Sequence, residues 1–128
     1  MNISIKLCEH IRERIIPQYV NFDKAHRIDH VEKVIEESMK LALHYEVNSA
    51  MVYTIAAYHD LGLCEGREFH HIVSGKILFA DETLWQWFTD DQMLQMKEAI
   101  EDHRASNKQA PRSIYGKIVA EADRIIDP

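Results

Sequence analysis

Apolar residues along this chain recur at spacings of three, four and seven, the period of helices that bury one face. Leu7, Ile11 and Ile15 form the first such stripe. Pro17 should end or kink that helix, because proline has no N–H to donate and clashes with the preceding turn. Residues 21–29 have the character of a connector. The chain contains no alternating pattern of useful strand length, so the helical period predicts its structure throughout.

Capping residues and one glycine delimit the next two predicted helices. Asp29, with Glu32 three residues later, forms a capping pair at the start of a second helix. Asn48 or Ser49 caps a third helix, which carries an apolar run. Gly62 is a natural stop for that helix.

The second half of the chain continues the helical pattern. A fourth helix is expected from about Phe69 to Ala80, and Leu84–Phe88 is expected to form a short helical turn. Thr89 caps a fifth helix, residues 104–112 form a polar loop, and Ser113 starts the last helix. We therefore predict an all-α fold, a compact bundle of about six helices.

Composition and charge narrow the class of protein. A chain of 128 residues with 46% hydrophobic and 28% charged residues suits one soluble domain spanning residues 1–128. Its net charge of −6 argues against extended nucleic-acid binding, although a bound cation would still allow a phosphate-bearing substrate. We expect no membrane span and no signal peptide. Because two cysteines are too few for a disulfide framework, we expect a cytoplasmic protein.

Two polar residues end an apolar helix at positions that the pattern predicts to be buried. His59 follows Val52, Ile55 and Ala56 by seven, four and three residues, and Asp60 is adjacent. A buried histidine and a buried carboxylate are costly unless something pairs with them. A divalent metal ion is a partner that would accept both.

Further candidates lie far away in the sequence. His30 opens the second helix, His103 continues the apolar stripe of the fifth, and Asp123 lies beside the stripe of the last. Taken singly, a histidine on an apolar face is more often a hydrogen-bonded core residue than a ligand, and Asp123 could pair with Arg124. Periodicity alone leaves the metal site and ordinary buried polar groups as open alternatives.

The segment Ala56-Ala57-Tyr58-His59-Asp60-Leu61-Gly62-Leu63 resembles the HD superfamily of metal-dependent phosphohydrolases. That family is an all-α fold defined by a histidine, then a His-Asp doublet, then a distant aspartate. Here His30-Val31-Glu32-Lys33-Val34 is similar to the first motif, and Glu121-Ala122-Asp123-Arg124 is similar to the last. The similarity extends over residues 25–126.

The resemblance implies a metal site. His30, His59, Asp60 and Asp123 would be the ligands of one divalent ion, for which Mn, Fe, Co, Ni and Zn all suit imidazole and carboxylate groups. Some relatives hold a second metal with two further histidines. The candidates for a second metal or for substrate are His70 or His71, together with His103.

The implied reaction is hydrolysis of a phosphomonoester or nucleotide by a metal-activated water molecule. Asp60 would orient the water as well as bind the metal. We favour Lys33 and Arg104 as catalytic phosphate contacts, with a solvated side chain as the equal alternative for each. Many relatives carry lysine or glutamate where this chain has Leu63, so the general acid must come from elsewhere.

Other interpretations remain open. The same fold supports di-iron oxygenases of small molecules, which would need all six ligands, and non-catalytic metal-binding or signalling modules. We expect the loop after His103 to border the pocket. The apolar cluster Trp85, Trp87 and Phe88 suits the core, which we favour, or the interface of a homodimer.

Overall fold

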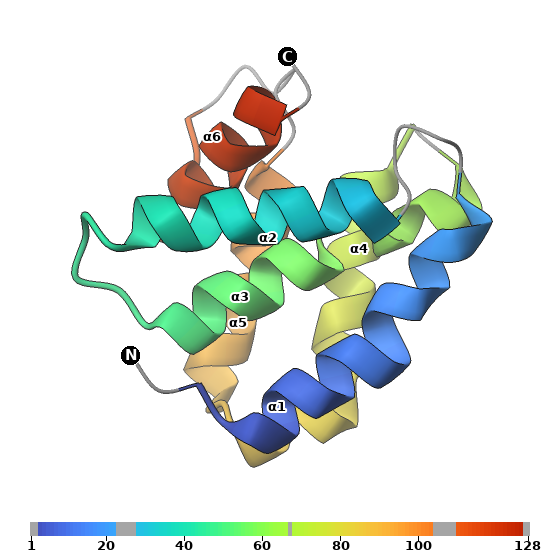
Figure 1. Ribbon diagram of the computed structural model, residues 1–128, viewed down its shortest axis with the longest axis horizontal. Helices are drawn as coiled ribbons and strands as arrows, with labels where there is room; N and C mark the ends of the chain where they lie inside the picture. Colours follow the sequence, from blue (N-terminus) through green and yellow to red (C-terminus); the bar gives the residue numbers. More distant parts are fainter. Residues whose placement is uncertain (1–2, 23–27, 67, 104–109, 127–128) are drawn as a thin grey trace.

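The computed structural model describes residues 3–22, 28–66, 68–103 and 110–126. These residues form helices joined by short turns and include no β-strand, which confirms the all-α prediction. The six α-helices are α1 (Ile5–His10), α2 (Ile28–Ala42), α3 (Ser49–Tyr58), α4 (His70–Ala80), α5 (Asp90–Asp102) and α6 (Ile114–Ile126). In Figure 1, α3 lies between α2 and α1, and α5 passes behind it.

The first helix changes its winding before Pro17. After α1 the chain forms a π-helical turn, Ile11–Ile15, in which the N–H of Ile16 donates to the carbonyl of Ile11. A 3₁₀ turn, Ile16–Asn21, follows with the proline in its first positions. Proline is tolerated there because the first N–H groups of a helix have no partner within it. The helical path therefore continues in a different winding and does not stop.

Side-chain caps start two of the helices as the sequence predicts. Asn48 accepts a hydrogen bond from the N–H of Met51 at the start of α3. Thr89 and Gln92 form a reciprocal capping box at the start of α5. The capping prediction for Asp29 is wrong, because α2 already begins at the preceding residue and Asp29 lies in its first turn. A carboxylate there still complements the positive end of the helix dipole.

Gly62 is needed for close packing and not for ending a helix. The helix α3 ends earlier, at Tyr58, and Gly62 belongs to a 3₁₀ turn, Leu61–Glu65. A Cβ atom at Gly62 would lie 2.2 Å from the carbonyl oxygen of His70 and 2.6 Å from the amide nitrogen of Ser74. The N–H of Gly62 also donates to the Ser74 hydroxyl at 2.7 Å. Glycine thus lets α4 approach the end of α3.

The helix α3 forms the centre of the core. Its side chains Ile55, Ala56 and Ala57 are fully buried, and α2, α5 and α6 all pack against it. Because an apolar helix covered on several sides cannot slide or rotate freely, its C-terminal end is held firmly. That end carries the His59-Asp60 doublet.

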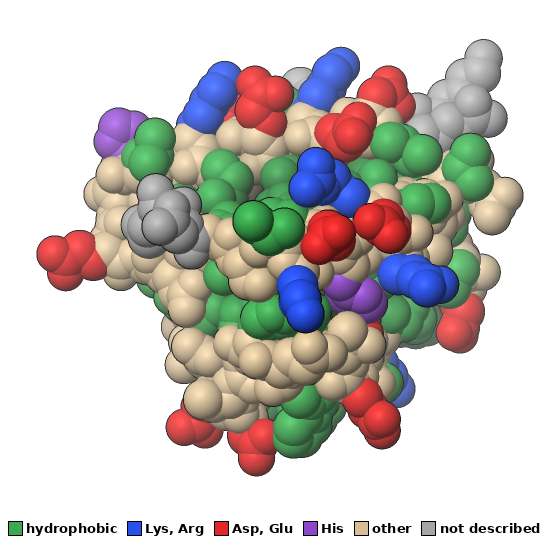
Figure 2. Space-filling model, turned by 60° about the horizontal axis from the view of Figure 1, so that its bottom comes forward, with side chains coloured by type: hydrophobic (Ala, Val, Ile, Leu, Met, Phe, Trp, Pro, Cys, Tyr) green, Lys and Arg blue, Asp and Glu red, His purple; other side chains and the backbone are tan. Residues whose placement is uncertain are grey.

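The surface carries charges of both signs. On the face shown in Figure 2, lysine and arginine side chains lie among aspartate and glutamate, with hydrophobic side chains between them. Phe88 is buried and Trp87 is half-buried against the core, whereas Trp85 is 51% exposed. Assembly into a homodimer stays a prediction. None of the described helices combines the length and apolar character needed to cross a bilayer.

Candidate metal centre

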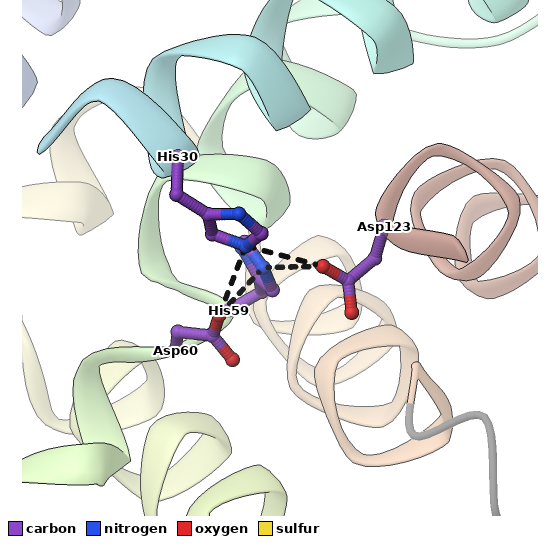
Figure 3. Close-up of side chains that lie close together, drawn as sticks. All are labelled: His30, His59, Asp60 and Asp123. Carbon is purple, nitrogen blue, oxygen red and sulfur yellow. Dashed lines mark ion pairs between the residues drawn. The ribbon is translucent and has the colours of Figure 1, made fainter. Parts of the chain in front are cut away.

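Three helices bring four side chains together (Figure 3). His30 comes from the first turn of α2, His59 and Asp60 directly follow α3, and Asp123 comes from α6. The side chain of His59 is completely buried, those of His30 and Asp60 are nearly so, and that of Asp123 is the most open. Residues separated by up to 93 positions therefore meet at one point, as the sequence analysis expects of a shared site.

The nitrogen and oxygen atoms of this cluster face each other at short range. His59 Nε2 lies 3.1 Å from Asp60 Oδ2 and 3.6 Å from Asp123 Oδ1. His30 Nε2 lies 3.7 Å and 3.4 Å from the same two oxygens. All four potential ligand atoms fall within 4.8 Å of one another. Such a spacing would let one small ion contact every one of them.

The orientation of the His59 ring is fixed by the backbone. Its Nδ1 donates to the carbonyl oxygen of Ala56 at 2.5 Å. This bond selects the tautomer whose Nε2 carries a lone pair, the arrangement typical of metal-bound histidine. Among the described residues, no hydrogen-bond partner reaches the buried Nε2. A buried nitrogen that is aimed at two carboxylates suits a cation, so the residues present fit a divalent metal.

A second cluster shares Asp60. The other carboxylate oxygen, Oδ1, lies 3.3 Å from His70 Nε2 and 3.5 Å from His103 Nε2. Nδ1 of His103 donates to the carbonyl of Ile100 at 2.5 Å, the same arrangement as at His59. These three ligand atoms also lie within 4.8 Å of one another. The two oxygens of Asp60 thus face two different sets of histidines.

Electrostatics make this region attractive to positive charge. Burial alone would lower the pKa of His59, but the carboxylates of Asp60 and Asp123 overcome it and raise the pKa well above its usual value. Burial alone would raise the pKa of Asp60, yet His59, His103 and His70 hold it well below its usual value. The pKa of Asp123 is lowered for the same reason, by His30 and His59. Protons or a metal ion can supply the positive charge.

The structure separates the two adjacent histidines of α4. His70 reaches the Asp60 carboxylate, whereas His71 packs beside His70 with ring centroids 5.9 Å apart and joins neither group of ligand atoms. The sequence left this choice open because the rotational phase of the helix was not known.

Of the two predicted phosphate contacts, only Lys33 belongs to the residues that the structure describes. Lys33 is exposed on α2, one turn after His30. Arg104 lies outside the described residues, as does most of the loop 104–112. At the end of that loop, Arg112 pairs with Asp102 on α5.

One residue near the doublet is not predicted by any pattern in the sequence. Tyr19 is completely buried, and its hydroxyl contacts the backbone of Ala57 and Asp60. The partners lie 38 and 41 residues away in the sequence, so no local pattern signals them.

Comparison with known proteins agrees with this arrangement. A family model described as the HD domain matches residues 27–126. Among solved structures, the fold is similar to a predicted HD superfamily hydrolase from an uncultured Thermotogales bacterium, with a TM-score of 0.74 and 22% sequence identity. The match covers 94% of this chain and 66% of that protein, so the chain spans slightly less than two thirds of it. No curated protein gives a significant match. The family model covers most of the chain, and the protein belongs to the HD domain family.

Proposed function

We propose that this protein is a divalent-metal-dependent phosphohydrolase that acts on a phosphomonoester or a nucleotide. The observation that carries the proposal is the convergence of His30, His59, Asp60 and Asp123, with Nε2 of His59 buried and aimed at both carboxylates. Membership of the HD domain family supports the same interpretation.

The proposed ligands suit a divalent transition metal. Two imidazoles and two carboxylates are nitrogen and oxygen donors that Mn, Fe, Co, Ni and Zn all accept. A metal bound there supplies a Lewis acid that polarises a phosphoryl oxygen and lowers the pKa of water. His70 and His103, with the second oxygen of Asp60, offer donors for one further ion.

The protein's own groups would bind and orient the reactants. Asp60 is almost completely buried, and its pKa is held low, so it stays ionised and can accept a hydrogen bond from water at neutral pH. Asp123 is 26% exposed, so the cluster is open to substrate on its side. Lys33 is exposed one helical turn from His30, where its ammonium group is available for a phosphate. Arg104, directly after His103, is the other proposed phosphate contact.

A second candidate function is oxidation of a small molecule by a di-iron centre. The presence of a second cluster favours it, since His70 and His103 bring the number of candidate ligand residues, Asp60 included, to the six that such a centre needs. The two functions differ in their need for iron and oxygen.

The experiment is a screen of phosphate monoesters and nucleotides, with the metal-free protein supplied with each metal in turn. We expect phosphate release that needs a divalent metal and is lost in His59→Ala. Metal binding without release of phosphate from any ester would contradict the proposal and point to a binding module. Oxygen consumption by the iron-loaded protein would point to the oxygenase.

A further inference from the structure

Tyr19 lies outside the part of the chain that matches the family model, yet it reaches the doublet. It belongs to the 3₁₀ turn Ile16–Asn21, whereas the family match begins at residue 27. Its side chain is fully buried, and its ring packs edge-on against Phe22 with centroids 5.3 Å apart. A tyrosine so deep in the core normally has a partner for its hydroxyl.

The hydroxyl of Tyr19 makes two hydrogen bonds with the backbone around the doublet. It donates to the carbonyl of Ala57 at 2.6 Å and accepts from the N–H of Asp60 at 3.3 Å. The carbonyl belongs to the last turn of α3, where intrahelical donors run out. The neighbouring carbonyl, of Ala56, receives Nδ1 of His59. The side chains of His59 and Tyr19 therefore donate to two consecutive carbonyls, at the point where α3 ends and the doublet begins.

We infer that Tyr19 is a positioning residue for the metal centre. Its hydroxyl holds the peptide of Asp60 at the angle that directs one carboxylate oxygen toward His59 and the other toward His70. Without the hydroxyl, the carbonyl of Ala57 and the N–H of Asp60 would be buried without this partner, and the doublet would relax. The inference deepens the proposed function and rests on it for the identity of the ligands.

The chain offers a matched control. Tyr58 is also fully buried in the same core, and its hydroxyl donates to Asp81 at 2.5 Å. Tyr19→Phe and Tyr58→Phe each remove one buried hydroxyl and leave the ring in place. A general loss of stability from the missing hydroxyl is therefore common to both variants. Only Tyr19→Phe also removes a contact with the backbone around the doublet.

The test titrates Co²⁺ into the metal-free parent and both variants, after circular dichroism has verified their helical content. We expect Tyr19→Phe to weaken Co²⁺ binding about 10- to 100-fold, as loss of groups that orient metal ligands typically does. The d–d absorption bands of its Co²⁺ complex should also shift. Tyr58→Phe should keep the parent's affinity and spectrum. Equal affinity and spectrum in Tyr19→Phe and the parent, or equal losses in both variants, would overturn the inference.

A second measurement needs no metal. In the metal-free protein, the amide proton of Asp60 should exchange with solvent faster in Tyr19→Phe than in Tyr58→Phe, because only the first loses its acceptor. Equal exchange in the two variants would contradict the inference. Should Tyr19→Phe fail to fold, Zn²⁺ is titrated into the parent. The ring resonances of Tyr19, but not those of Tyr58, should then shift, and unchanged resonances of Tyr19 would overturn it.

Failure of the proposed function gives a different result. A parent that binds Co²⁺ but hydrolyses no phosphate ester contradicts the phosphohydrolase and leaves the comparison of the two tyrosines valid. A parent that binds metal and is active, with Tyr19→Phe indistinguishable from it, refutes only the role of Tyr19.

Discussion

Tyr58 and His59 are neighbours in the sequence, yet they lead into two different polar clusters. Tyr58 joins His10 and Asp81, which we call the closed cluster. His59 joins His30, Asp60 and Asp123, which we call the open cluster. Both combine histidine with carboxylate in a mostly buried setting, so residue type alone does not distinguish them.

In the closed cluster, hydrogen bonds occupy both carboxylate oxygens of Asp81. Asp81 Oδ2 accepts from the Tyr58 hydroxyl at 2.5 Å and from His10 Nε2 at 3.0 Å, and Asp81 Oδ1 accepts from the N–H of Thr83 at 3.1 Å. Burial alone would raise the pKa of Asp81, but the hydrogen bonds from Tyr58 and His10 lower it below its usual value. Such a network stabilises the junction between α1, α3 and the turn after α4, and it has no need of a further ligand.

The polar atoms of the open cluster point toward one another, but His59 Nε2 is left without a hydrogen bond among the described residues. The ring nitrogens and carboxylate oxygens of this cluster are separated by 3.1 to 3.7 Å. Convergence of ligand atoms on a common point, with the tautomer of His59 fixed by the carbonyl of Ala56, is what distinguishes this candidate metal site from a structural network.

The largest predicted difference is between Asp60→Ala and Asp81→Ala. Because Asp60 faces every candidate ligand of both sets, its loss should weaken Mn²⁺ binding by more than the roughly 10- to 100-fold typical of losing a group that only orients a ligand. Asp81→Ala should lower the melting temperature and keep the parent's affinity for Mn²⁺. Isothermal titration calorimetry measures the Mn²⁺ affinity of both variants, and thermal denaturation measures their melting temperatures. Loss of binding in both variants to the same extent would mean that the two clusters do not differ as we argue.

The next largest effect concerns the second set of ligands. His103→Ala should reduce the number of bound metal ions from two to one and leave the site of His30, His59, Asp60 and Asp123 occupied, since His103 Nε2 lies near Asp60 Oδ1, whereas His30 and His59 lie near Oδ2. His71→Ala is the control, because His71 joins neither set. Metal content after equilibrium dialysis gives the stoichiometry. A parent that binds a single ion with no contribution from His103 would limit the site to the first four residues.

A smaller effect is expected from pH at the closed cluster. The folded-state pKa of Asp81 is lowered below the value of about 3.9 expected in the unfolded chain, so the unfolded chain binds more protons in acid. Its contribution to stability should be complete above about pH 5 and lost as the pH falls through the folded-state pKa. Asp81→Asn should cost about 1–3 kcal/mol in unfolding free energy at pH 7.

Urea denaturation of the parent and Asp81→Asn at pH 7 and at pH 3 measures this contribution. The difference in unfolding free energy between the two proteins should narrow at the lower pH. A difference that is the same at both values would show that the charge of Asp81 does not stabilise the fold.

The smallest effect is predicted next to the open cluster, at Arg124. Although Arg124 follows Asp123 directly, it is exposed and pairs with Glu121 one turn earlier on α6. Pairs of this kind are screened by solvent and contribute little. Arg124→Ala should change neither the melting temperature nor the affinity for Mn²⁺ measurably. A marked loss of metal binding would instead give Arg124 a role in the site.

The sequence predicted most of the helices, because their apolar stripes and caps are local signals. The caps at Asn48 and Thr89 depend only on residues three positions away, and both predictions are confirmed. The cap predicted at Asp29 is wrong, because α2 already includes Asp29 in its first turn. The prediction that Gly62 ends a helix is wrong. Glycine is needed there for close contact with α4, through residues eight and twelve positions later that no local pattern indicates.

The residues of the candidate site also differ in whether local sequence signals could predict them. His59 could be placed on a buried face because periodicity fixes its phase on α3. The choice between His70 and His71 could not be made, since both stand at the beginning of α4 where the phase is set by tertiary packing. Tyr19 could not be predicted as part of the site, because its two contacts are made across the fold, with backbone atoms that no side-chain pattern reveals.

The most direct test of the open cluster is a crystal structure of the Mn²⁺-soaked protein with anomalous diffraction measured near the manganese edge. Our account predicts an anomalous peak within bonding distance of His59 Nε2 and Asp60 Oδ2, with His30 and Asp123 completing the contacts. A map in which these four side chains surround no anomalous density, while manganese binds elsewhere or not at all, would contradict it.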